Sequence, residues 1–181
     1  MSDQKIRFAS RDASGFIKDV KSEAQAYFDK TGLSKHADAG MVLKTVIILL
    51  VTFGSYGMII SGAFSLMQMW GLAFVMGVGA AGIGFCDAHD ALHGAYSSKN
   101  WVNKLLGYGF DILGANSYMW KITHNVIHHT YTNIPGVDED LTVSPIVRLS
   151  PEAPRHSFHM LQQFYAIPAY SLATINWLFA K

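Results

Sequence analysis

The sequence is poor in charge over one long stretch. Between Met41 and Phe85 only Lys44 carries a formal charge, and charged residues make up 15% of a chain that is half hydrophobic. This distribution is unusual for a soluble domain of 181 residues. The net charge of +1 offers no basic surface, so a nucleic-acid partner is not expected.

Cysteine is also scarce. The single Cys86 excludes an internal disulfide, and the lack of paired cysteines argues against a structural zinc site. The HExxH motif, which would supply a general base beside zinc, is absent. The first forty residues mix acids and bases without an early apolar run, so a secretory signal is not expected.

Where charge is missing, hydrophobic runs are present. The runs 42–60 and 63–85 are each long enough to cross a bilayer core of about 30 Å, and only Ser61 and Gly62 separate them. They predict a transmembrane hairpin. A third run, 161–180, is also free of charge until its end and is expected to be a third span, although Pro168 and Asn176 weaken it. The alternative for each run is a buried helix of a soluble core.

The basic residues predict the orientation of these spans. They occur before the first span and between the second and third, and are absent from the turn at Ser61–Gly62. By the positive-inside rule, residues 1–40 and 86–160 are therefore expected on the cytoplasmic side. The basic residues before the first span are Lys5, Arg7, Arg11, Lys18, Lys21, Lys30 and Lys35, and those between the later spans are Lys99, Lys104, Lys121, Arg148 and Arg155.

Shorter segments complete an all-α membrane protein with about three transmembrane helices plus cytoplasmic or interfacial helices. Apolar residues from Phe16 to Phe28 recur at helical spacing, and Gly32 is placed to end that helix. The helix is expected to be amphipathic and to lie on the membrane or the cytoplasmic body, or to be an ordinary surface helix. Residues 100–114 are apolar but too short to span, and 133–141 read as a turn followed by an acidic patch.

Histidine is concentrated in two short stretches. His89 and His93 are four residues apart, as are His124 and His128, with His129 directly after. On a helix this spacing places two rings on one face, roughly 6 Å apart, where both can bind one metal ion.

An α-helix would turn the His129 ring about 100° away from His128, toward a second ion or a neighbouring pocket wall. Imidazole suits zinc, copper, iron and nickel, so the residues alone leave the metal open. Asp87 or Asp90 is a candidate to accept the second ring N–H of a ligand, or is a solvated acid. The other histidines, His36, His156 and His159, are not expected to be ligands.

These residues resemble the membrane fatty acid desaturases. The stretch "HDALHG" is similar to the first histidine box of that family, and "HNVIHHTYTNIPGVDEDL" to the second box and the residues after it. The likeness covers nearly the whole chain and is greatest to the bacterial acyl-lipid and linoleoyl-CoA (delta-6 type) branch. The resemblance implies a protein of the bacterial inner membrane with its histidine boxes on the cytoplasmic face.

The resemblance also implies the chemistry. Its members use two iron ions, O2 and two electrons to desaturate an acyl chain carried on CoA or lipid. By carry-over from the family's boxes, the expected metal ligands and catalytic residues are His89, His93, His124, His128 and His129. No HPGG haem-binding motif is present, so electrons are expected from a separate ferredoxin or cytochrome b5 type protein.

One part of the family pattern is missing. Members carry a third box of the type Q/HxxHH, and "HSFHMLQQF" does not fit it. Five histidines are fewer ligands than two irons need. The chain is therefore expected to be the N-terminal part of a desaturase domain with four or more spans, and to be inactive by itself.

Two other functions remain open from the sequence. The same site could serve a di-iron hydroxylase, ketolase or epoxygenase. A non-enzymatic protein that binds or transports metal is the second alternative, but its histidines should lie within the spans.

Overall fold

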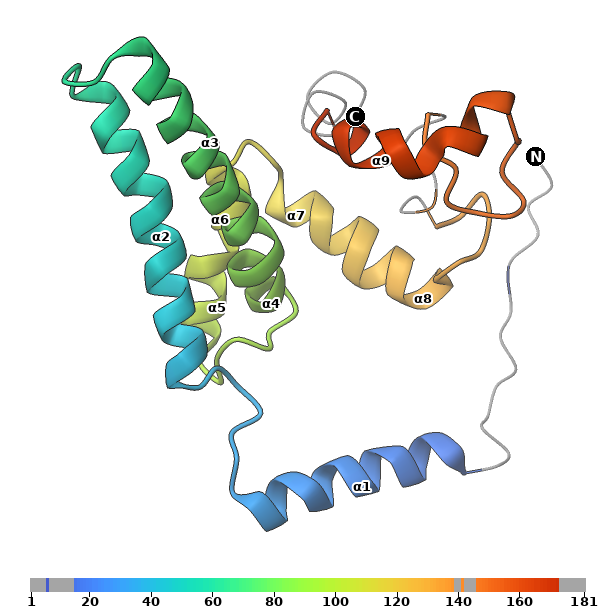
Figure 1. Ribbon diagram of the computed structural model, residues 1–181. Coiled ribbons are helices and arrows are strands. Elements are labelled where there is room, and N and C mark those ends of the chain that lie inside the picture. Colours follow the sequence, from blue (N-terminus) through green and yellow to red (C-terminus); the bar gives the residue numbers. More distant parts are fainter. Residues whose placement is uncertain (1–5, 7–14, 139–140, 142–145, 173–181) are drawn as a thin grey trace.

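The structure, a computed structural model, describes residues 6, 15–138, 141 and 146–172. Its regular secondary structure within these residues is all helical, with no strand among them (Figure 1). The predicted all-α class is confirmed for this part of the chain. The helices are α1 (Phe16–Thr31), α2 (Ala39–Ile60), α3 (Leu66–Gly82), α4 (His89–Leu92), α5 (Asn100–Gly107), α6 (Gly109–Ile112), α7 (Ser117–Trp120), α8 (His129–Tyr131) and α9 (Gln162–Tyr170), with π-helices η1 (Ile83–Ala88) and η2 (Lys121–His128) and the 3-10 helix η4 (Ser157–Leu161).

Two long helices form the hairpin that the hydrophobic runs predicted. Helix α2 has 22 residues, and α3, η1 and α4 join into one helix of 27 residues, Leu66–Leu92. Both are long and apolar enough to cross a membrane, and they pack side by side (Figure 1). The second run was expected to end at Phe85. The helix instead continues to Leu92 and ends just before Gly94, whose φ of 74° turns the chain away.

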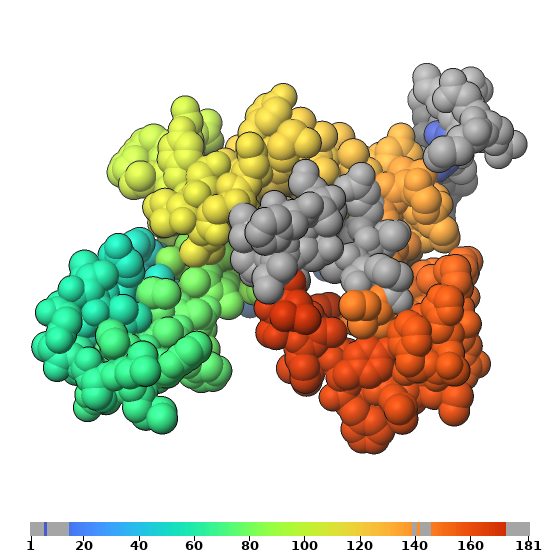
Figure 2. Space-filling model, turned by 90° about the horizontal axis from the view of Figure 1, so that it is seen from above, coloured from blue at the N-terminus to red at the C-terminus, as the bar shows by residue number. Residues whose placement is uncertain are grey.

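The predicted third span lies partly outside the described residues. Within them, the segment forms α9, which ends at Tyr170 and is followed by a turn. In Figure 2, η4 and α9 lie on the opposite side of the view from the α2–α3 hairpin. The expectation of a third span stays a prediction.

Helix α2 buries polar side chains, whereas many large apolar side chains of the hairpin are exposed. The buried residues of α2 are Thr45, Thr52 and Ser55. Thr45 Oγ1 donates to the buried Asp87 Oδ1 at 2.7 Å and accepts from the Tyr96 hydroxyl at 2.9 Å. Large apolar side chains point outward, including Leu43, Leu50, Phe53, Trp70 and Phe74. This polarity suits lipid as the solvent, since polar groups must then find partners inside the protein.

Local sequence signals account for the helix ends. Asp38 begins α2 by accepting from Met41 N at 2.8 Å, and Ser65 begins α3 through a capping box with Gln68. Helix α1 ends at Gly32 with φ 65°, as the sequence predicts. In Figure 1 it lies below the Ala39 end of the hairpin and extends to one side, and it buries none of its residues. Its contact with a membrane stays a prediction.

The short helices pack against the end of the hairpin that carries the histidines. Helices α5 and α6 contact η1 and enclose a small core of Ala88, Leu92 and Phe110. Trp120, at the end of α7, packs against this core. Helices α7, η2 and α8 then continue as one helix away from the hairpin (Figure 1).

The close approach of α2 and α3 predicts a sharp difference between two glycines on one helix. A Cβ on Gly79 would overlap Thr52 Oγ1 and lie 3.1 Å from Thr52 N, whereas one on Gly77 would meet nothing within 4 Å. We expect Gly79→Ala to lower the free energy of unfolding by roughly 1–3 kcal/mol through overpacking. Gly77→Ala should leave it unchanged or raise it by up to about 1 kcal/mol. Thermal unfolding in detergent measures both, and equal midpoints would contradict this packing.

Candidate metal centre

The first histidine pair lies where the 27-residue helix ends. His89 begins α4, and His93 caps it, with His93 N donating to His89 O at 3.1 Å. Their ring centroids are 4.5 Å apart. The pair thus shares one face of the helix, as its spacing predicted.

The second set of histidines lies on a π-helix, which changes the predicted geometry. The His124 and His128 rings stack with centroids 4.9 Å apart and planes 14° apart. The His129 ring lies 5.0 Å from that of His124. The planes of the His128 and His129 rings are 77° apart, and the expectation that His129 serves a second ion or a pocket wall stays a prediction. The hydrogen bonds of a π-helix join residues five apart, which brings residue i+5 toward the face of residue i.

The two helices bring the five rings together. The His124 ring lies 5.6 Å from that of His89 and 5.4 Å from that of His93, and the His129 ring lies 4.9 Å from that of His93. One ring nitrogen each of His89, His93 and His124 lie within 4.8 Å of one another. Since metal–imidazole bonds are about 2 Å long, nitrogens on one ion lie roughly 3–4 Å apart, so small side-chain shifts would suffice. The residues present therefore fit a metal ion.

Two side chains hold the helices in this arrangement. Asn125 Nδ2 donates to Leu92 O at 3.0 Å and so joins η2 to the end of α4. The Trp120 ring stacks on His124 at 4.4 Å and meets the His89 and His93 rings edge to face, each at 5.5 Å. Trp120 is therefore both part of the apolar core and one wall of the histidine cluster.

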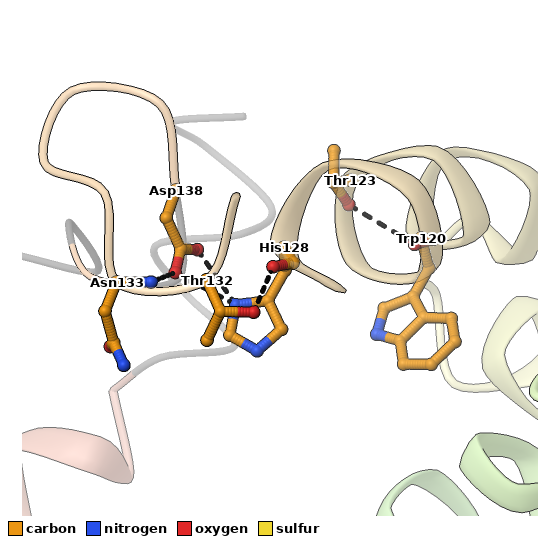
Figure 3. A network of polar contacts seen from close by, with 6 residues as sticks. All are labelled: Trp120, Thr123, His128, Thr132, Asn133 and Asp138. Carbon is orange, nitrogen blue, oxygen red and sulfur yellow. Dashed lines mark hydrogen bonds and ion pairs between the residues drawn. The ribbon is translucent and has the colours of Figure 1, made fainter. Parts of the chain in front are cut away.

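The environment of His93 favours its neutral form. Burial lowers the pKa of His93 below its ordinary value, and the neighbouring imidazoles lower that pKa further. A neutral ring keeps the lone pair that a metal needs. Two carboxylates contact ring nitrogens of the cluster: Asp90 lies 3.1 Å from His89 Nδ1, and Asp138 lies 2.9 Å from His128 Nδ1 (Figure 3).

Comparison with known proteins identifies the family. The family model described as fatty acid desaturase matches residues 33–181. The chain belongs to the fatty acid desaturase family. Two cyanobacterial relatives are each named sn-1 linoleoyl-lipid 6-desaturase. The protein from Arthrospira platensis is 36% identical over 92% of this chain, and that from Synechocystis sp. is 33% identical over 96%.

The alignments cover only part of these relatives. They include 45% of the Arthrospira protein and 48% of the Synechocystis protein, so the chain spans about half the length of the curated relatives it matches. An acyl-lipid (8-3)-desaturase of Physcomitrium patens is 28% identical over 96% of this chain and 37% of its own length. No solved structure matches the chain.

Some residues beside the histidine cluster were not predicted from the sequence. Of the two candidate carboxylates, Asp90 contacts His89, whereas Asp87 accepts from Thr45 instead. Asp138 had been read as part of an acidic patch, yet its side chain is buried. Trp120 carried one usable signal, since it lies four residues before His124 on the same helix.

The remaining histidines lie outside the cluster's ring contacts. His36 is half-buried, and its Nδ1 lies 3.1 Å from Ala95 O. The His156 and His159 rings pack against Phe158.

The Asn125 contact predicts a shared loss of stability and metal affinity. In Asn125→Ala the Leu92 carbonyl loses its donor, which should cost roughly 1–3 kcal/mol of unfolding free energy and let the two histidine-bearing helices separate. Thermal unfolding and titration with Co²⁺ measure the two effects. Asn100→Ala, at an exposed position of α5, is the control and should change neither. Wild-type values for Asn125→Ala would show that this hydrogen bond does not hold the site.

Proposed function

We propose that the full-length protein is a di-iron desaturase that introduces a double bond into the acyl chain of a membrane lipid. The observation that carries the proposal is the convergence of five imidazoles from two helices in a chain that the fatty acid desaturase family matches over residues 33–181. An acyl lipid is the proposed substrate because the cyanobacterial relatives are named for acting on linoleoyl lipids.

The reaction is an oxygen-dependent dehydrogenation. Two neighbouring methylenes, O2, two electrons and two protons yield one carbon–carbon double bond and two molecules of water. A bound pair of iron ions supplies the oxidising power that unactivated C–H bonds require. The electrons are proposed to come from a separate ferredoxin or cytochrome b5 type protein.

The residues of this chain bind the metal and shape the site. The proposed ligands are His89, His93, His124, His128 and His129. A set made only of imidazoles is compatible with iron. Trp120, with Phe110 at a ring distance of 5.1 Å, forms an apolar wall beside the cluster. Such a wall excludes water from the metals and suits an acyl chain.

The rest of the ligand set is proposed to come from outside these 181 residues. Five imidazoles are too few for two ions, and the aligned relatives are about twice as long as the aligned region. The fragment alone is therefore proposed to be inactive. The protein is proposed to lie in the membrane, which is supported by two helices long and apolar enough to cross it. The basic residues flanking these helices favour a cytoplasmic site at the bacterial inner membrane.

Substitution of the central histidine tests this function. The His124 ring contacts those of His89, His93, His128 and His129, so His124→Ala in the full-length protein should reduce bound iron by roughly tenfold or more and abolish product. Iron is measured by elemental analysis and product by mass spectrometry of membrane lipids. His156→Ala removes an exposed imidazole remote from these ring contacts and should retain both.

The possible results separate the alternatives. Full retention of iron and unsaturated product in His124→Ala would overturn the proposal. A hydroxylated product from the wild-type protein would assign it to the hydroxylases instead. Iron binding without any product in the full-length protein supplied with O2 and an electron donor would indicate a metal-binding role only.

A further inference from the structure

A buried carboxylate lies directly against one of the proposed ligands. Asp138 is 1% exposed, and its Oδ1 and Oδ2 lie 2.9 and 3.1 Å from His128 Nδ1. Its Oδ2 also accepts from Asn133 N at 2.8 Å. A charge buried in this way is costly unless donors satisfy it, and here a ring N–H and a backbone N–H do so.

The loop between the two residues is folded so that this contact forms. Asn133 has a φ of 63° and turns the chain back after α8. Ile134 O then accepts from Val137 N at 3.2 Å and from Asp138 N at 3.0 Å, which winds the next residues into a tight turn. Figure 3 shows the result: Asp138 approaches the His128 ring from the loop, on the side away from Trp120.

This contact decides which nitrogen of His128 can bind a metal. An ionised carboxylate only accepts hydrogen bonds, so the proton of the neutral imidazole must lie on Nδ1. The lone pair is then on Nε2, on the far side of the ring. The ring plane is also fixed, stacked on His124 with planes 14° apart.

We propose that Asp138 is a positioning residue that fixes His128 in the tautomer whose Nε2 is the metal ligand. The inference deepens the proposed metal centre and rests on it. Asp138 differs from Asp90, which holds His89 in a comparable way but is exposed to about a third. Water can compete for the contact between Asp90 and His89, whereas it is excluded from the contact between Asp138 and His128. We therefore expect Asp138 to have the larger effect on the position and tautomer of its histidine.

Metal affinity is the first measurement. The variants are Asp138→Asn, which keeps the shape but removes the charge, and Asp138→Ala, which removes both. Competition with a chelator for Co²⁺ and Fe²⁺ in the full-length protein should show affinity weakened by about 10- to 100-fold in both variants. Asp29→Asn, the same chemical change on the exposed face of α1, is the matched control and should bind as tightly as the wild type.

The histidine tautomer is the second measurement, and it needs no metal. The ¹⁵N ring shifts of His128 in metal-free protein labelled at histidine, assigned by comparison with His128→Gln, should report Nδ1–H in the wild type. Asp138→Ala should give a mixture of tautomers. A role in stability alone would lower the unfolding midpoint without changing the tautomer. If the alanine variant fails to fold, Asp138→Asn carries the comparison.

The outcomes distinguish this inference from the metal centre itself. Unchanged affinity together with an unchanged tautomer in both Asp138 variants overturns the role of Asp138 and leaves the metal centre standing. A wild-type protein that binds neither ion overturns the metal centre, and the ring shifts then decide whether Asp138 fixes the tautomer. Weakened affinity with a released tautomer supports the whole inference.

Discussion

The crossing of two histidine-bearing helices around Trp120 is the contact on which the site depends. The indole stacks on His124 from one helix and meets His89 and His93 from the other, while its remaining surface joins the core of Ala88, Leu92 and Phe110. Asn125 fixes the same crossing through the Leu92 carbonyl. The histidine cluster thus shares Trp120 with the small apolar core found in the described residues. A change in the packing of that core would therefore also change the geometry of the histidines.

A change of helix type makes the second histidine set compact. In η2 the hydrogen bonds close over five residues, which gathers His124, His128 and His129 toward one region. A second π-helix, η1, directly precedes the first pair and includes Asp87, whose carboxylate joins that helix to Thr45 of α2. Irregular helix therefore occurs beside both histidine sets, where π-helical turns frequently mark function.

The hairpin and the cluster place opposite demands on their surroundings. The outer faces of α2 and α3 are apolar and suit lipid, whereas the cluster end is rich in nitrogen and oxygen. The protein resolves this with internal partners: Thr45 for Asp87, Tyr96 for Thr45, and His128 with Asn133 for Asp138. A buried carboxylate near a membrane is tolerated only with such donors, which makes these polar contacts part of the fold.

The sequence by itself determined the all-α class, the two long apolar helices, the family and the five histidines, because hydrophobic length, charge and short-range spacing are local properties. It also gave Gly32 as the end of α1. Only the tertiary structure decided how near the His129 ring lies to the other rings, that the second helix extends through His89, and that Asp138 contacts a ring nitrogen as the predicted Asp90 does. These features depend on the type of helix and on a loop that folds back from Asn133. Residue spacing predicts neither the π-helix nor the fold of the loop when α-helical periodicity is assumed.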